Sequence, residues 1–324
     1  MQLRNLGKTG LRVTHICLGT MAFGRWIDEE QSRRVLDAAL DAGINFIDTA
    51  NIYGKGMDTG NHEQKGESEA ILGRLLREKR HQIVLATKVR GQMGADPNAE
   101  GLSRKHIMAA VEDSLRRLQT EYIDLYQVHS FDPRTPLEES MRALDDLVRH
   151  GKVRYIGCSN FAAWQVAKAN GIAERWGLSP FISVQPQYSL LVRDIERELI
   201  PYCLSENVGI MPYSPLARGL LTGKYREGAQ PPAGTRAAAG ESRLHALMTE
   251  RNYNQVEAFR TLCAEWGLPM ARVAMAWVLA NPAVTSAISG ASKPEHVADA
   301  VAAAEVHLTR EQLANLDTLF SAMR

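Results

Sequence analysis

The segment DEEQSRRVLDAALDAGINFIDT, residues 28–49, joins one helical pattern to one strand pattern. Acidic residues open it and apolar residues recur at three- and four-residue spacing, which predicts an amphipathic helix over 29–42. Gly43 follows where the chain must turn, and the β-branched and aromatic run at 44–49 predicts a buried strand. The segment is therefore one helix-to-strand step of an α/β fold.

The same alternation continues along the chain. Strand patterns occur at 15–20, 44–49, 83–88, 123–129, 153–160, 181–188, 208–214 and 284–290. Helical patterns occur at 29–42, 67–77, 104–118, 136–149, 162–176, 195–206 and 309–322. Parallel strands joined by helices are right-handed units, and eight of them close into a (β/α)8 barrel, the TIM barrel. A short β-hairpin around 7–10 precedes the barrel.

A doubly wound open sheet is the alternative architecture. Its glycine-rich GxGxxG fingerprint is absent after the first strand, where the chain reads GTMAFG at 19–24. We find no internal repeat and no shift in composition, so residues 1–324 are predicted to form a single barrel domain. The alternation of strand and helix patterns is interrupted once, after the seventh strand. There the segment PLARGLLTGKYREGAQPPAGTRAAAGESR at 215–243 predicts a long loop. Such a loop is either functional or a disordered excursion.

Charge and cysteine usage narrow the function classes. The chain has 38 basic and 37 acidic residues, a net charge of +1, which offers nothing to attract nucleic acid or an anionic membrane surface. The four cysteines form no CxxC pair, which argues against a zinc site or a disulfide framework and favours the cytoplasm. No apolar run reaches the ~20 residues that span a bilayer, and the N-terminus has no secretory leader pattern.

Four ionisable side chains fall at the same end of consecutive predicted strands. They are Asp48 at the end of the second strand, Tyr53 on the loop after it, Lys88 at the end of the third and His129 at the end of the fourth. Each alone also fits an ordinary polar loop or strand end. Because the carboxyl ends of barrel strands surround one site, we expect the four to converge there.

The residue types suggest proton transfer. A phenol has a pKa of about 10, and the Lys88 ammonium is expected to lower it by stabilising the phenolate. Asp48 would hold Lys88 in place and keep it charged. Tyr53 would then act as a general acid toward an oxygen that becomes negative, and His129 would donate a hydrogen bond to that oxygen.

Over nearly its whole length the chain resembles the aldo-keto reductase superfamily. The motifs, in family order, are LGKTGLRVTHICLGTMAFG, GINFIDTANIYG, LATK, DLYQVH, GKVRYIGCSNF, VQPQYSLL, YSPLARGLLTGKY and SGASKPEHV. The resemblance implies a barrel that binds NADP(H) and transfers a hydride to an aldehyde or ketone, or the reverse alcohol oxidation, with the tetrad Asp48, Tyr53, Lys88 and His129.

The resemblance also implies cofactor contacts. Those near the nicotinamide and its ribose are Thr20, Met21, Asp48, Ser159, Asn160, Gln185 and Tyr213; those near the pyrophosphate are Ser214, Pro215, Leu216, Gly219, Lys224 and Arg236; those near the adenosine 2′-phosphate are Gly290, Ser292, Lys293, His296 and Asp299. His296 and Ala300 depart from the family pattern of Gln or Arg and of Asn. A neutral histidine is a weaker phosphate ligand than arginine, yet NADP(H) remains favoured over NAD(H).

Substrate and partners are less defined. Trp26, Tyr53, His129 and Phe131 are the candidate substrate contacts, with Tyr188 a further aromatic candidate. The chain also resembles the potassium channel beta subunits, regulators of the same superfamily with feeble turnover. Those carry Asn at the position of His129, which favours the enzyme. The pattern leaves the physiological substrate, the reaction direction and the oligomeric state open.

Overall fold

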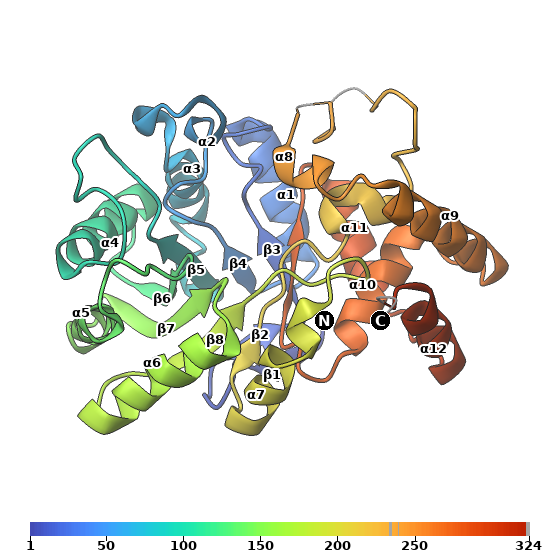
Figure 1. The fold of residues 1–324 in the computed structure, drawn as a ribbon. Helices are drawn as coiled ribbons and strands as arrows, with labels where there is room; N and C mark the ends of the chain where they lie inside the picture. The colour runs from blue at the N-terminus through green and yellow to red at the C-terminus, as the bar shows by residue number, and fades with distance from the viewer. Residues whose placement is uncertain (233–234, 239, 322–324) are drawn as a thin grey trace.

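The computed structural model describes residues 1–232, 235–238 and 240–321, which form a (β/α)8 barrel (Figure 1). The eight parallel strands pair in the order β10-β3-β4-β5-β6-β7-β8-β9. Parallel bridges between Ile210 and Val284 and between Tyr213 and Ile288 bring the last strands together. The predicted barrel is confirmed, and the open-sheet alternative is wrong.

Each predicted strand overlaps one barrel strand. The strands are β3 (Ile16–Gly19), β4 (Phe46–Asp48), β5 (Val84–Val89), β6 (Ile123–Val128), β7 (Val153–Ser159), β8 (Phe181–Gln185), β9 (Gly209–Ile210) and β10 (Ala287–Gly290). β4, β8, β9 and β10 are each shorter than predicted by three residues or more. Prolines follow two of them, Pro186 after β8 and Pro212 after β9, and a proline cannot donate a hydrogen bond to a neighbouring strand.

The helices between the strands also agree closely with the sequence patterns. They are α1 (Glu29–Asp41), α3 (Glu67–Leu76), α4 (Arg104–Leu118), α5 (Leu137–Arg149), α6 (Ala163–Trp176) and α7 (Leu199–Glu206), with a short α2 (Gly56–Thr59) before α3 and with the 3-10 turns η1 (His62–Gln64), η2 (Arg80–Gln82) and η3 (Asp194–Glu196). The helix predicted from residue 195 begins later, at Leu199, because Pro201 is tolerated only in a first turn.

The opening segment shows how local chemistry sets one helix-to-strand step. Asp28 caps α1 by accepting a hydrogen bond from the Gln31 backbone at 2.8 Å. Gly43 then turns the chain at a φ of +77°, which a glycine adopts without steric cost. The strand β4 follows directly, so the carboxyl end of β4 is delivered to the barrel rim.

Alternation along the strands places apolar and polar layers inside the barrel. In β4, Phe46 and Asp48 lie two residues apart, and in β5 Ala86 and Lys88 do the same. Phe46 and Ala86 belong to an interior apolar cluster. Asp48 and Lys88 are buried one layer further toward the carboxyl ends of the strands, so a polar layer lies directly above an apolar layer inside the barrel.

The predicted N-terminal hairpin closes the other end. Strands β1 (Leu3–Asn5) and β2 (Arg12–Thr14) pair antiparallel. Leu6 and Val13 are fully buried and join the interior apolar cluster. Figure 1 shows this hairpin at one end of the barrel and α2 and α8 at the opposite end.

The long loop predicted at 215–243 contains η4 (Ala217–Thr222) and the first residues of α8 (Ser242–His245). Residues 233–234 and 239 of this loop lie outside the described residues. The helices α9 (Glu250–Glu265) and α10 (Met270–Ala280) follow it and lead to β10. After β10 come α11 (Pro294–Ala303) and α12 (Arg310–Leu319). The helix predicted over 309–322 therefore ends earlier, at Leu319, and residue 322 lies outside the described residues.

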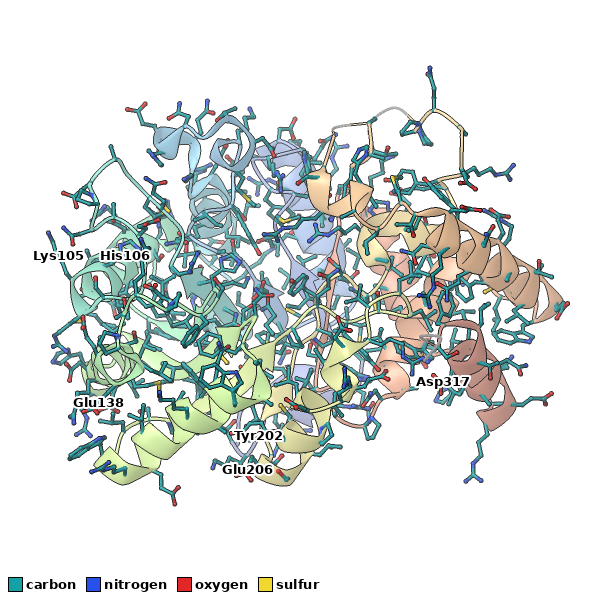
Figure 2. The ribbon with its side chains drawn as sticks, viewed as in Figure 1. Lys105, His106, Glu138, Tyr202, Glu206 and Asp317 are labelled. Carbon is teal, nitrogen blue, oxygen red and sulfur yellow. The ribbon has the colours of Figure 1, made fainter. Side chains whose placement is uncertain are left out.

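Outer helices carry polar side chains on the barrel's surface; Figure 2 shows Glu138 on α5 and Glu206 on α7 away from the strands. None of the described helices is both long enough and apolar enough to cross a bilayer. Within the same residues, no cluster of three or more metal-ligating side chains is found. All four cysteines are buried and free.

Candidate active site

A buried ion pair joins the ends of β4 and β5. The Lys88 ammonium donates to Oδ1 of Asp48 at 2.5 Å and to the backbone carbonyl of Thr49 at 2.8 Å. The Lys88 side chain is 0% exposed and that of Asp48 is 3% exposed. Two charges removed from water need such direct pairing and further hydrogen bonds to be tolerated.

Two glutamines complete the environment of the carboxylate. Oδ2 of Asp48 accepts hydrogen bonds from Gln127 at 3.0 Å and from Gln185 at 2.9 Å. Gln185 also donates to Oε1 of Gln127 at 3.2 Å. Gln127 was not among the predicted site residues. Its position two residues before His129 in β6 was the available signal, since residues two apart share a strand face.

Tyr53 and His129 lie beside this pair. The Lys88 ammonium is 3.3 Å from the Tyr53 hydroxyl and 5.0 Å from the centre of its ring. The Tyr53 and His129 rings meet edge to face with centroids 5.9 Å apart. The structure therefore brings the four predicted residues together at the carboxyl ends of β4, β5 and β6.

Burial and charge set the protonation of these groups. Burial alone would lower the pKa of Lys88, but the Asp48 carboxylate and Tyr53 raise it overall, so the amine stays an ammonium. Burial holds the pKa of His129 well below its usual range, and the Lys88, Arg243 and Arg90 charges act in the same direction. His129 is therefore a neutral imidazole, and its Nδ1 is buried without a partner among the described residues.

The expected acidity of the phenol needs correction. Burial raises the pKa of Tyr53 above its usual value, and Lys88 only partly opposes that effect. The contribution of Lys88 has the predicted sign, but the predicted net lowering of the pKa is wrong for the protein alone. A phenol that keeps its proton at neutral pH can still serve as a proton donor.

The residues expected near the nicotinamide are linked to each other. Asn160 accepts from the Tyr213 hydroxyl at 2.9 Å and donates to the carbonyl of His129 at 2.9 Å. Ser159 donates to the carbonyl of Gln185 at 2.8 Å. These bonds use most of the polar atoms expected to hold a carboxamide, so a bound ring would have to exchange some of them or use remaining lone pairs.

Thr20 and Met21 follow β3. The Thr20 side chain is fully buried and its hydroxyl lies 3.0 Å from both the carbonyl of Asp48 and the hydroxyl of Ser68. Its hydroxyl therefore ties β3 to β4 and α3. Met21 is half-buried at the rim.

The segment expected at the pyrophosphate has an unusual backbone. Ser214, Ala217, Arg218 and Gly219 all have positive φ. Successive residues of this kind can turn backbone N–H groups toward a common point and create a site that favours anions. A Cβ on Gly219 would lie 2.9 Å from Cε of Lys224, so the lysine side chain passes directly over this glycine. Pro215 is buried and Leu216 half-buried in the same turn.

Arg236 reaches the end of β10. Its guanidinium lies 4.8 Å from the Trp26 ring, and a Cβ on Gly290 would come within 3.6 Å of its Nη2. It also lies 3.7 Å from Glu241. Arg236, expected at the pyrophosphate, thus lies beside Gly290, expected at the 2′-phosphate, and Trp26 lies against the same arginine.

The segment expected at the 2′-phosphate begins α11. The Ser292 backbone donates to Nδ1 of His296 at 3.3 Å. Burial lowers the pKa of His296, and Lys224 and Lys293 lower it further, so these two lysines lie near one neutral histidine. Asp299 is instead paired with Arg272 at 2.9 Å and points its Oδ1 there.

The aromatic substrate candidates differ in their placement. Phe131 packs edge to face on Phe161 at 5.5 Å and on Trp164 at 5.9 Å. Trp164, which is 57% exposed, was not among the predicted substrate contacts. Its position on the helix α6 did not indicate from the sequence that it lies beside Phe131. Tyr188 is 1% exposed and donates to Glu196 at 2.7 Å, so the prediction that it contacts substrate is wrong.

The arrangement can move one proton in a defined place. A protonated phenol lies between an ammonium that stabilises its conjugate base and a neutral imidazole that can donate a hydrogen bond. Positive-φ backbone and a lysine lie on a neighbouring loop, which fits a phosphate-bearing cofactor.

Comparison with known proteins points the same way. The sequence model of the Aldo/keto reductase family matches residues 15–320. The uncharacterized oxidoreductase YrpG of Bacillus subtilis is 43% identical, over 99% of this chain and 96% of its own. The versiconal hemiacetal acetate reductase of Aspergillus parasiticus is 36% identical, covering 98% and 96%. A probable voltage-gated potassium channel subunit beta of rice is 35% identical, covering 94% and 92%.

Proposed function

We propose that the chain, which belongs to the aldo/keto reductase family, is an NADPH-dependent reductase of aldehydes or ketones. Its membership of this family supports a role as an oxidoreductase. Relatives that are named as an oxidoreductase and as a reductase support the same role. The observation that carries the finer proposal is the buried Lys88 ammonium in contact with both the Asp48 carboxylate and the Tyr53 hydroxyl.

The tetrad residues would divide the work around a carbonyl oxygen. Tyr53 donates its proton to that oxygen as the alcohol forms, and the nearby Lys88 ammonium stabilises the phenolate left behind. Neutral His129 donates a hydrogen bond that orients the carbonyl oxygen before the proton moves. Asp48 keeps Lys88 in position. The phenolate regains a proton from water after the alcohol leaves.

NADPH, when bound, supplies the hydride for the carbonyl carbon. Asn160, Gln185 and Tyr213 are proposed to hold its nicotinamide end. The turn from Ser214 to Gly219 with Lys224 is proposed to hold the pyrophosphate. Lys293, Ser292 and Arg236 are proposed to favour the 2′-phosphate of NADP(H) over NAD(H).

We further propose that the chain forms one domain and works on small molecules in the cytoplasm. The four free, buried cysteines support a reducing compartment. The balanced charge gives no reason to expect nucleic acid as a partner.

A regulatory role is the second candidate, because a relative named as a probable potassium channel beta subunit matches most of the chain. Such a regulator would bind the nucleotide with little turnover. The two candidate functions are compatible with the same fold and differ in the rate at which the bound nucleotide is oxidised.

Titration of the purified protein with NADPH and with NADH, followed by a panel of carbonyl compounds on the tighter cofactor, tests the proposal. We expect NADPH to bind more tightly and to be oxidised by several aldehydes. Binding without oxidation would favour the regulatory role, and failure to bind either nucleotide would overturn both.

A further inference from the structure

Arg243 lies at the active-site end of the barrel on α8. Figure 1 shows α8 at the same end as α2, opposite the β1–β2 hairpin. The next residue, Leu244, is 0% exposed and belongs to the main hydrophobic core, so it anchors this short helix. Arg243 itself is exposed. A fixed helix therefore presents a cation beside the site.

Neighbouring arginines on this side of the barrel already have carboxylate partners. Arg218 pairs with Glu241, which also lies near Arg236. Arg25 pairs with Asp58 at 2.5 Å. Among the described residues, Arg243 makes neither an ion pair nor a side-chain hydrogen bond. Its guanidinium is thus available to a group outside the chain.

The charge of Arg243 acts on the reaction centre. Burial raises the pKa of Tyr53 and Tyr213 and lowers that of His129; the Arg243 charge opposes the first effect and adds to the second, so its guanidinium lies within electrostatic reach of all three rings. These rings surround the proposed position of the carbonyl oxygen. An anionic group beside Arg243 would therefore lie close to the reacting carbonyl.

Arg90 adds a second cation from the other direction. It directly follows β5 with a φ of +134°, a costly conformation for a residue with a Cβ. Its Nε is buried without a partner among residues 1–232, 235–238 and 240–321. It also acts on the pKa of His129. Two arginines without carboxylate partners therefore approach one imidazole from separate strands and loops.

The phosphate groups of the cofactor have other proposed partners. The proposed phosphate contacts lie on the turn at Ser214–Gly219 with Lys224, and at the start of α11. The group expected beside Tyr53 and His129 is the carbonyl substrate. An anion near Arg243 and Arg90 is therefore best supplied by that substrate.

We propose that Arg243 and Arg90 bind a carboxylate of the substrate, so that the preferred substrates are aldehydes or ketones bearing a carboxylate a few bonds from the carbonyl. The proposal rests on the proposed reductase function and names its substrate class. Arginine suits this task because its planar guanidinium matches the carboxylate in two parallel hydrogen bonds.

Two probes of similar size test the proposal, 4-carboxybenzaldehyde and its neutral ester methyl 4-formylbenzoate. The wild type is expected to prefer the acid by about 10- to 100-fold in kcat/KM, the range that a charged hydrogen bond supplies. Arg243→Leu and Arg90→Leu are each expected to bring the acid-to-ester ratio toward one, chiefly through KM. Arg243→Lys should retain part of the preference.

Arg116→Leu is the matched control. Arg116 is a highly exposed arginine in the last turn of α4, which lies at the far end of the barrel because α4 runs back from the carboxyl end of β5. It should keep the wild-type ratio. Circular dichroism checks that each variant is folded, and raised salt should reduce the preference only where Arg243 is present.

The outcomes separate the two proposals. Equal kcat/KM for acid and ester in the wild type, or an unchanged ratio in Arg243→Leu, overturns the carboxylate site and leaves the reductase intact. If neither probe is reduced, the reductase proposal fails. Calorimetric titration of both probes then decides the site: tighter binding of the acid that weakens in Arg243→Leu supports it, and equal binding overturns it.

Discussion

The side-chain amide of Gln127 donates a hydrogen bond to Oδ2 of Asp48 at 3.0 Å, while the Lys88 ammonium binds Oδ1 of the same carboxylate at 2.5 Å. The two donors hold the carboxylate from separate oxygens. The Asp48 carboxylate is therefore held in the orientation that places Oδ1 on the Lys88 ammonium, beside Tyr53.

Gln127→Leu should weaken both stability and turnover. The variant removes a hydrogen bond to a buried charge and an acceptor for Gln185, which we expect to cost about 1.5 to 3 kcal/mol in the free energy of unfolding. Urea unfolding and steady-state kinetics measure the two effects. Gln31→Leu on the exposed face of α1 is the control, and an equal effect in both variants would show that Gln127 has no special role.

Lys88→Met should abolish most turnover and destabilise the fold. It leaves the Asp48 carboxylate buried without its cation, which costs about 3 to 5 kcal/mol. The double variant Asp48→Asn/Lys88→Met removes both charges and should regain stability without regaining turnover. A near-normal rate in Lys88→Met would remove the ammonium from the mechanism.

The rate of carbonyl reduction should be flat with pH through neutrality. The raised pKa of Tyr53 keeps the proton donor loaded, and the lowered pKa of His129 keeps the imidazole neutral. The rate should decline only above about pH 10, as the phenol loses its proton. Measurement of kcat across this range tests the assignment, and an inflection near the ordinary histidine pKa of about 6.5 would contradict it.

Stability should fall as the pH drops below neutrality, partly through His15. Burial, with the Arg4 charge, lowers the pKa of His15 from 6.5 to about 4, so the unfolded chain binds its proton first. The folded state therefore loses about 3 kcal/mol relative to the unfolded chain as the pH falls from 6.5 to 4.

Urea unfolding at several pH values measures that loss. His15→Gln should flatten the dependence relative to the wild type, and His150→Gln, at an exposed position, should not. Parallel curves for wild type and His15→Gln would remove His15 from the account.

Much of the fold and the tetrad was predictable because periodicity is a local property. The helix patterns and strand patterns around residues 28–49 are readable without knowing what lies beside them. Asp48, Lys88 and His129 could be placed together because the carboxyl ends of parallel strands share one rim.

The rest depended on packing that no local pattern records. Gln127 lies in β6, and its role depends on the direction in which its side chain points after the barrel closes. Tyr188 was misplaced for the same reason, since it points to Glu196 rather than to the site. Arg243 lies in a segment without periodicity, where only the folded chain reveals which arginines have carboxylate partners.

Single-turnover oxidation of NADPH shows directly whether Tyr53 is the proton donor. Wild type and Tyr53→Phe are each loaded with NADPH and mixed with 4-carboxybenzaldehyde, and loss of the reduced-nicotinamide fluorescence is followed. We expect equal NADPH affinity and a rate at least about 100-fold lower in the variant, because only the proton donor is removed. Equal rates in the two proteins, or bound NADPH that wild type never oxidises, would contradict it.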